Sequence, residues 1–243
     1  GEYLVILLNT TMFLEHILTK NVDGNDSLKI LDLCAAPGGK TTIIKSVVSD
    51  SSLVIANEVI SKRVPALCDN VSKWGCENIF VTNNDPAELG KLIDFFDVIV
   101  VDAPCSGSGM FRKDRASINH WSLQNVEMCS KRQRRILADI LPSLKPGGLL
   151  VYSTCSYSSM ENEEIADWLM DNFPLKNVSV EISPDWGIVD SRSGKNKAVG
   201  YRFYPYNLKG EGFYATAFRK NATATVKEIN FKTFKEDKLV RTR

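Results

Sequence analysis

The sequence predicts an α/β protein built around a mostly parallel sheet, and three observations support that prediction. Apolar strands alternate with amphipathic helices from residue 28 to residue 170, which is the pattern of successive βαβ units. A turn of small residues, 34–40, lies where the first strand passes into the next helix. Two short aromatic-rich segments, 201–204 and 212–218, can pair as an antiparallel hairpin at the sheet edge.

The individual elements follow from apolar periodicity and turn residues. A helix over residues 10–20 is expected from the apolar stripe of Met12, Phe13, Ile17 and Leu18. Continuous apolar runs predict strands at 28–33, 52–57, 79–82, 96–101 and 149–153. The other helices are expected at 41–48, 62–73 and 123–141, with a last one, opened by a capping box of Ser158 and Glu161, that ends at Met170. The polar segment 190–200 is expected to be mobile.

Composition excludes several classes of function. The chain has 243 residues with 30 Lys and Arg against 29 Asp and Glu, so its net charge of +1 indicates no partner by itself. No apolar run approaches the roughly 18 residues that a membrane helix needs. Two histidines, His16 and His120, are too few for a multi-histidine metal site, and no metal is expected. Six cysteines without CxxC spacing or a secretory signal indicate reduced thiols in a cytoplasmic protein.

Acidic residues follow the expected strands at regular places. The small residues of the 34–40 turn let the backbone approach a ligand closely, although an ordinary tight turn is the alternative, because neither the P-loop nor the GxGxxG pattern is present. Glu58 ends the second strand, Asp85 follows the third and Asp102 ends the fourth. Since the carboxyl ends of parallel strands meet at one edge, we expect these carboxylates to line one crevice, with Glu58 placed to bind ribose hydroxyls.

Two cysteines are expected to face the same crevice. Cys105 follows the fourth strand in Asp-Ala-Pro-Cys-Ser-Gly, and Cys155 follows the fifth in Ser-Thr-Cys-Ser-Tyr. A cysteine between a strand and a capped helix is a candidate nucleophile, because the helix dipole lowers its pKa. A disulfide between the two is the alternative, which a reducing compartment disfavours. Burial as small apolar side chains is the better interpretation of Cys68, Cys76 and Cys129.

The segments DLCAAPGGKT, VDAPCSGSGMFRKD and YSTCSYSSMENEE together resemble the Nop/Sun (Fmu) family of RNA cytosine-5 methyltransferases, and are most similar to its bacterial 16S ribosomal RNA branch. The resemblance covers about residues 3–220. It implies a class I S-adenosylmethionine-dependent methyltransferase fold, Rossmann-like, with a seven-stranded sheet whose last strand is antiparallel. It also implies a helical lead-in over 1–27, a catalytic domain over 28–220, and a charged tail or the start of a truncated region over 221–243.

The resemblance further implies roles for individual residues. Cys155 matches the catalytic nucleophile, and Cys105 matches the second cysteine, which assists release of the methylated product. Residues implied to bind S-adenosylmethionine are Cys34, Ala35, Ala36, Pro37, Gly38, Gly39, Lys40, Glu58, Asp85 and Asp102, with Asp85 beside the adenine. The chain is thus expected to methylate carbon 5 of a cytosine in RNA as a monomer without membrane attachment.

Several alternatives remain open. The Pro104-Cys105 pair resembles the nucleophile motif of DNA cytosine methyltransferases, so the two cysteines could have exchanged roles. The substrate could be transfer RNA, or the chain could be a non-catalytic RNA-binding or ribosome assembly factor. Residues 3–8 lack the glutamine that is usual in the family, and Tyr206 stands where the family commonly has histidine.

Basic residues cluster after the first cysteine motif. Arg112, Lys113 and Arg115 are expected to meet the phosphates of bound RNA. Lys195, Lys197 and Arg202 can extend that track, whereas residues 131–135 are as well explained by a solvated helix face. Phe111 and Trp121 can stack on bases or pack in the core.

Overall fold

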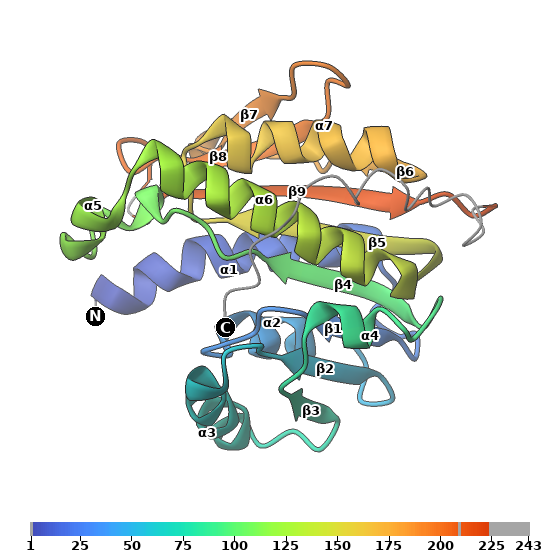
Figure 1. Cartoon of the computed structure of the whole chain (residues 1–243). Coiled ribbons are helices and arrows are strands. Elements are labelled where there is room, and N and C mark those ends of the chain that lie inside the picture. The colour runs from blue at the N-terminus through green and yellow to red at the C-terminus, as the bar shows by residue number, and fades with distance from the viewer. Residues whose placement is uncertain (1, 209, 224–243) are drawn as a thin grey trace.

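The computed structural model describes residues 2–208 and 210–223, which form one sheet with helices on both faces (Figure 1). The nine strands lie in the order β3-β2-β1-β4-β5-β9-β8-β7, and β6 pairs with β9. The parallel half comprises β1 Lys29–Asp32, β2 Leu53–Asn57, β3 Ile79–Thr82, β4 Phe96–Asp102 and β5 Leu144–Thr154. The antiparallel half comprises β6 Leu175–Val178, β7 Val189–Arg192, β8 Val199–Phe203 and β9 Phe213–Lys220.

The mostly parallel sheet and its antiparallel hairpin are as predicted, but the sheet has two more strands than the seven expected. The short strand β6 pairs with the C-terminal half of β9, so Leu175 lies opposite Lys220. The strand β7 extends the edge beside β8, within the segment that the sequence predicted to be mobile. That segment is ordered by Asp167, whose carboxylate accepts hydrogen bonds from Ser193 Oγ at 2.6 Å and Asn196 N at 2.7 Å.

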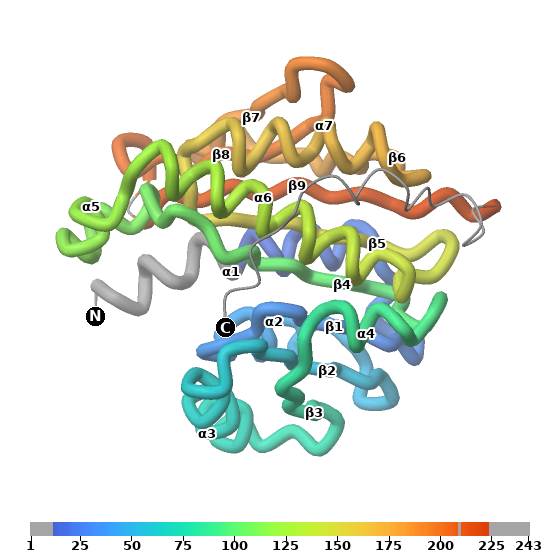
Figure 2. The backbone as a smooth tube through the Cα atoms, viewed as in Figure 1, coloured from blue at the N-terminus to red at the C-terminus, as the bar shows by residue number. Residues whose placement is uncertain are grey.

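Helices cover both faces of the sheet, as the backbone tube in Figure 2 shows. Each face has its own apolar core. On one face lie α1 Glu2–Asn21, α2 Gly39–Ser46 and α3 Val64–Trp74, and on the other α4 Pro86–Leu89, α6 Leu123–Ile140 and α7 Glu163–Asn172. Alternate residues of β4 serve the two cores, because side chains of a strand point to opposite faces. Val98 and Val100 belong to the first, and Ile99 and Val101 to the second.

The lead-in helix is longer than predicted and packs into the first core. Its side chains Phe13, Ile17 and Leu18 are buried there, so α1 shares its packing with β1. The expected tail, 221–243, lies outside the described residues from 224 onward. Among the described helices, none has both the length and the apolar character that crossing a membrane requires.

The carboxyl ends of the five parallel strands point to the same edge of the sheet, where the short helix α5 Ala116–His120 also lies (Figure 1). The strand β9 runs the opposite way, as its arrow in Figure 1 shows. The loops that follow β1, β2, β4 and β5 therefore meet at this edge, which brings the sequence-predicted site residues together.

Candidate active site

The two cysteines of the sequence motifs lie side by side at the ends of β4 and β5. These strands are in register, with Asp102 opposite Ser153, so the loop residues Cys105 and Cys155 emerge next to each other. Their Sγ atoms lie 3.0 Å apart, and both side chains are partly exposed. This separation is that of two thiols and not of a disulfide, in which the sulfur atoms lie about 2.05 Å apart. Cys105 and Cys155 are free cysteines, as a reducing compartment predicted.

The contact between the two thiols affects the protonation of Cys105. The hydrogen bond between Cys105 and Cys155, together with burial, raises the pKa of Cys105 well above its usual range. For Cys105 this direction is opposite to the lowering by a helix dipole that the sequence suggested for a loop cysteine, and the reasons are its close thiol partner and its partial burial. Cys105 is therefore a protonated thiol at neutral pH, in contact with the sulfur of Cys155.

A buried carboxylate joins the loops that carry the two cysteines. Glu161 is inaccessible to solvent and accepts hydrogen bonds from Ser106 N at 2.8 Å, Ser106 Oγ at 2.6 Å and Ser156 Oγ at 2.5 Å. Gln133 Nε2 donates a further bond at 3.3 Å. Ser106 and Ser156 directly follow the two cysteines, so Glu161 links the backbone positions of both. Within the described residues no cation lies at ion-pair distance from it, and these hydrogen bonds compensate its burial.

The sequence predicted a different role for Glu161. As the fourth residue of a capping box it would bond to the backbone of Ser158, but the Ser158 side chain makes no cap hydrogen bond, and α7 begins at Glu163. The capping box is therefore wrong. Its residues form a single 3-10 turn, because the carboxylate of Glu161 turns inward to the serine residues of the cysteine loops.

The small-residue turn after β1 packs closely against α3 at Gly38, whereas the space beside Gly39 is open. Gly38 has a φ of +112°, a conformation that residues with a side chain rarely adopt, and a Cβ there would lie 3.2 Å from the Leu67 side chain. No atom lies within 4 Å of the Cβ position of Gly39. Gly39 also begins α2, and Gly38 provides no side chain to cap the first N–H groups of this helix.

Two carboxylates at the ends of β1 and β2 are buried with one oxygen lacking a hydrogen bond. Glu58 is 2% exposed; its Oε1 accepts from Ile60 N at 2.9 Å, while Oε2 has only the ion pair with Arg63 Nη1 at 3.1 Å. Asp32 is fully buried, with Thr41 Oγ1 donating to its Oδ2 at 2.7 Å and Oδ1 without a partner. Burial raises the pKa of Asp32 to about 7.

Lys40 connects the small-residue turn to the end of β4. Its Nζ donates to Asp102 Oδ2 at 2.7 Å, and Ser153 Oγ donates to Asp102 Oδ1 at 2.8 Å. Burial of Lys40 favours loss of its proton, but the charge of Asp102 and this hydrogen bond outweigh it and raise the pKa of Lys40. A fixed positive charge thus lies beside the carboxylate at the end of β4. Burial also raises the pKa of Cys34 well above its usual range, so this turn cysteine acts as a small apolar residue.

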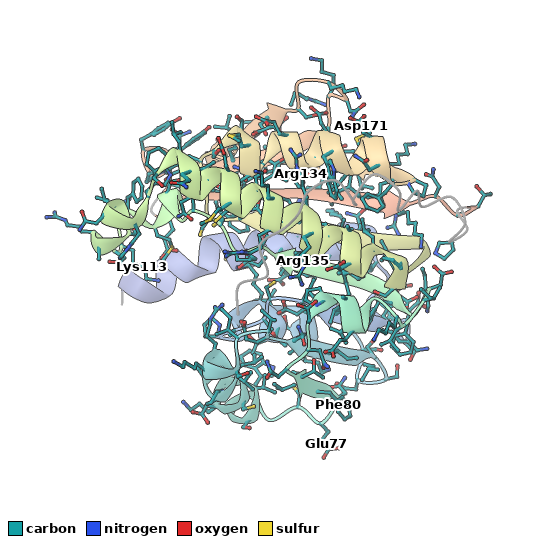
Figure 3. All side chains as sticks on the ribbon, viewed as in Figure 1. Glu77, Phe80, Lys113, Arg134, Arg135 and Asp171 are labelled. Carbon is teal, nitrogen blue, oxygen red and sulfur yellow. The ribbon has the colours of Figure 1, made fainter. Side chains whose placement is uncertain are left out.

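Asp85 lies at the expected strand end but is engaged by protein groups. Its Oδ1 caps α4 by accepting a hydrogen bond from Ala87 N at 3.0 Å. Arg135 Nη2 donates to both carboxylate oxygens of Asp85, at 2.7 Å and 2.5 Å. Figure 3 shows Arg135 on α6 facing the half of the molecule that contains α4. The Asp85 side chain is 41% exposed, so a ligand can reach its carboxylate beside this ion pair.

The predicted basic track is only partly present. Arg112 and Arg115 are exposed, and Lys113 pairs with Glu211 at 2.8 Å. Arg202 is wrong as an RNA contact, because it is buried and its Nε donates to Glu163 Oε1 at 2.6 Å. Lys195 pairs with Asp171 at the exposed turn between β7 and β8, and Phe111 and Trp121 pack edge to face with ring centroids 6.4 Å apart.

Three residues of the site escaped the sequence reasoning. Glu161 resembled a capping residue, Arg63 looked like part of an ordinary helix start, and Asp32 looked like the end of a strand. The signal available for Glu161 was its place six residues after Cys155, on the turn that follows the fifth strand. No group of three or more histidine, cysteine, aspartate or glutamate side chains in the described part of the chain could hold a metal ion.

Comparison with known proteins agrees with this geometry. A family model described as 16S rRNA methyltransferase RsmB/F matches residues 18–219. Ribosomal RNA small subunit methyltransferase F of Escherichia coli K12 is 36% identical over 203 residues, which cover 82% of this chain and 41% of that protein. The chain thus spans about two fifths of the length of the curated relatives it matches.

Solved structures show the same fold. The crystal structure of NSun6 from Pyrococcus horikoshii with SFG has a TM-score of 0.70 and 28% identity, and the match covers 85% of this chain and 51% of that one. A SAM-dependent O-methyltransferase from Thermotoga maritima, at 15% identity, has a TM-score of 0.53 and covers 89% and 66%. The sheet is accordingly of the Rossmann-like class I methyltransferase type. With its two cysteine loops side by side and a family match over most of its length, the chain belongs to the 16S rRNA methyltransferase RsmB/F family.

Proposed function

We propose that this chain transfers a methyl group from S-adenosylmethionine to carbon 5 of a cytosine in 16S ribosomal RNA, through a covalent bond between Cys155 and the base. The observation that supports this most is the thiol pair, Cys105 and Cys155, with Sγ atoms 3.0 Å apart at the ends of two adjacent parallel strands. A protein that only bound RNA would have no use for two free thiols in contact at the centre of its site.

The residues at the ends of β1 and β2 suit S-adenosylmethionine. The buried Glu58 Oε2 lacks a hydrogen-bond donor, which ribose hydroxyls would supply, and the space above Gly39 is open at a helix N-terminus, where an anionic carboxylate is favoured. The turn 34–40, Glu58, Asp85 and Asp102 would hold the donor. S-adenosylmethionine supplies, when bound, an electrophilic methyl group on a sulfonium ion.

The chain's own residues make the cytosine reactive. Carbon 5 of cytosine is a poor nucleophile, so the thiolate of Cys155 first adds to carbon 6, and the electron pair of the C5–C6 double bond makes carbon 5 nucleophilic. Asp102 is the group proposed to lie near N3 and favour this addition. The ion pair with Lys40 at 2.7 Å and the bond from Ser153 hold its carboxylate in one orientation.

Cys105 acts when the methylated base leaves. The proton on carbon 5 departs to a base, its electron pair re-forms the C5–C6 double bond, and the C6–S bond breaks with its electrons returning to Cys155. Since the pKa of Cys105 is raised well above its usual range, its thiol keeps its proton and can donate a hydrogen bond to the departing sulfur of Cys155. The product is thereby released, and Cys155 leaves as the thiolate with which the cycle began.

The proposed substrate is a single-stranded or flipped-out cytosine, because a stacked base cannot bring carbon 6 to a sulfur inside a strand-end crevice. Arg112 and Arg115 are the exposed cations that lie next to the Cys105 loop and can meet RNA phosphates. Transfer RNA as substrate is the alternative, since the thiol pair does not distinguish between RNA classes. We further propose that the protein acts in the cytoplasm as a monomer.

Cysteine variants test the chemistry. Cys155→Ser is expected to abolish turnover and to form no adduct, whereas Cys105→Ser is expected to accumulate a covalent protein–RNA adduct that resists denaturing electrophoresis. Full turnover by Cys105→Ser without adduct would contradict this division of labour, and an adduct that maps to Cys105 would indicate exchanged roles.

Bisulfite mapping of ribosomal and transfer RNA after deletion of the gene tests the substrate: loss of one 16S site is expected, and an unchanged map would support a non-catalytic factor.

A further inference from the structure

Three tyrosine rings form a continuous stack, which we call the tyrosine stack, from the Cys155 loop to the molecular surface. Tyr157 and Tyr204 have ring centroids 5.9 Å apart with an interplanar angle of 17°, and Tyr204 and Tyr206 have centroids 5.1 Å apart at 14°. These values are those of offset-stacked aromatic rings. Tyr206 ends the stack with 76% of its side chain exposed, so one ring face is free to take another flat group.

The inner end of the stack is fixed relative to the reacting thiol. Tyr157 follows Cys155 by two residues, and its carbonyl oxygen accepts a hydrogen bond from Arg202 Nη1 at 3.1 Å. Its ring lies directly against Gly212, where a Cβ would come within 2.3 Å of the ring. Gly212 N in turn donates to Gly109 O at 3.0 Å, and Gly109 N donates to Cys155 O at 2.8 Å. The cysteine loop and the base of the stack therefore form one tightly packed unit.

We propose that the exposed face of Tyr206 binds an unpaired nucleobase that neighbours the target cytosine in the RNA strand. This inference rests on the proposed function, because it uses an RNA strand at Cys155. Moving the target base out of its stack leaves a neighbouring base with a free face, and an aromatic side chain that continues its stack replaces the lost contact. Every base has such a face, so this binding is tolerant of sequence.

Charge beside the tyrosine stack favours RNA over a protein segment as the occupant. Arg112 is exposed, and its Nη1 donates to the carbonyl of Pro205, between Tyr204 and Tyr206, at 3.4 Å. No carboxylate of residues 12–208 or 210–223 forms an ion pair with Arg112, so its guanidinium is available to a phosphate. An exposed ring with a neighbouring unpaired cation is the combination that single-stranded nucleic acids bind.

Fluorescence of a stacked base tests the inference directly. The probe is a single-stranded RNA of twelve nucleotides with one 2-aminopurine, whose fluorescence is quenched on stacking, added to the 243-residue chain. Tyr206→Ala is expected to weaken binding about ten-fold or more, from the usual strength of base–aromatic stacking, and to remove most of the quenching. Tyr206→Phe keeps the ring and is expected to match the original protein.

An exposed aromatic residue elsewhere provides the matched control. Phe80 is 56% exposed on the edge strand β3, at the end of the molecule far from Lys113 and the neighbouring cysteine loop (Figure 3), and Phe80→Ala is expected to change neither quantity. Unchanged binding and quenching by Tyr206→Ala, or no binding of the probe by the original chain, would overturn the inference. An equal loss with Tyr206→Phe would do so too, because it would indicate a hydroxyl contact instead of stacking.

Methyl transfer by the same variants separates the inference from the proposed function. If the original chain quenches the probe through Tyr206 but forms no 5-methylcytosine in 16S RNA, the stacking site stands and the proposed reaction fails. If the chain methylates RNA and Tyr206→Ala leaves both KM and kcat unchanged, the reaction stands and the stacking site fails. The expected result is a rise in KM of about ten-fold with a smaller change in kcat.

Discussion

The sulfur of Cys105 lies 3.0 Å from the sulfur of Cys155, and the hydrogen bond between them helps to hold Cys105 in its protonated form. This bond, with burial, raises the pKa of Cys105, so at neutral pH Cys105 should react slowly with iodoacetamide, because only the thiolate displaces its iodide. Cys155→Ala removes the bond, and the pKa of Cys105 should then fall. The midpoint of Cys105 alkylation against pH, measured by peptide mass spectrometry, is expected to move to lower pH.

The matched control for that experiment is Cys76→Ala, since Cys76 lies in the turn between α3 and β3, away from the thiol pair. Its alkylation profile for Cys105 should coincide with that of the original protein. If the Cys105 midpoint were the same in Cys155→Ala and in the original protein, the contact with Cys155 would not be what raises the pKa of Cys105.

Glu161→Gln tests the carboxylate that joins the cysteine loops. The amide nitrogen of glutamine cannot accept the bonds from Ser106 and Ser156, so the loops should lose their fixed spacing, and kcat should fall about 5- to 100-fold, the equivalent of one lost bond to a buried charge. Glu161 also raises the pKa of Cys105, so its neutralisation should shift the Cys105 alkylation midpoint to lower pH.

If Glu161 only held the loops in place, Glu161→Gln would not shift the pH midpoint of Cys105 alkylation. Glu164→Gln is the control, because Glu164 is exposed at the start of α7, three residues after Glu161, and accepts a hydrogen bond from Ser159 Oγ at 3.2 Å. It should leave both kcat and the alkylation profile unchanged. An alkylation profile of Glu161→Gln that overlays the original would mean that Glu161 does not act on the thiol pair.

The fold was predictable where a local pattern determined it. The sequence predicted a strand over residues 79–82, and β3 has the same bounds, because polar residues flank the apolar run on both sides. β6 and β7 were missed because each is stabilised by pairing with β9 or β8, which a local pattern does not reveal.

The candidate site was predictable in its residues but not in its contacts. Strand ends placed Cys105 and Cys155 at one edge, whereas the inward turn of Glu161 depends partly on Ser106, which is 55 residues away in the sequence. Arg202 shows the converse: a basic residue in a predicted edge strand was expected to face RNA, yet it is held by Glu163 from a helix that the sequence cannot place opposite it.

Glu58→Ala is expected to weaken binding of S-adenosylmethionine about ten-fold or more, because ribose hydroxyls would lose a charged acceptor. Isothermal titration calorimetry with S-adenosylmethionine measures this without any RNA. Glu77→Ala, which changes an exposed carboxylate next to β3 (Figure 3), should bind the donor as before. An unaltered affinity in Glu58→Ala would remove Glu58 from the donor site.

Arg202→Ala is expected to lower the free energy of unfolding by about 3–5 kcal/mol, because it leaves the buried Glu163 carboxylate without its cation. Lys195→Ala breaks the exposed pair with Asp171 and should cost at most about 1 kcal/mol. Urea unfolding followed by circular dichroism compares the two. Equal losses for the two variants would show that burial of the Arg202 pair has no special importance.

Asp32→Asn should stabilise the protein increasingly as pH rises. Burial raises the pKa of Asp32 to about 7, so between its unfolded value near 4 and pH 7 the folded state keeps a proton that the unfolded state has lost. The free energy of unfolding therefore falls across that window, by up to about 4 kcal/mol. Asparagine can still accept from Thr41 and carries no charge, so this loss should disappear.

Urea midpoints at pH 4.5 and pH 7.5 measure the difference, without added ligand. Asp32→Asn should resemble the original protein at the lower pH and exceed it at the higher, while the exposed Asp69→Asn should follow the original at both. The pH dependence has this sign because a raised acid pKa favours the protonated folded state. A constant gap between Asp32→Asn and the original at the two pH values would mean that Asp32 does not take up a proton on folding.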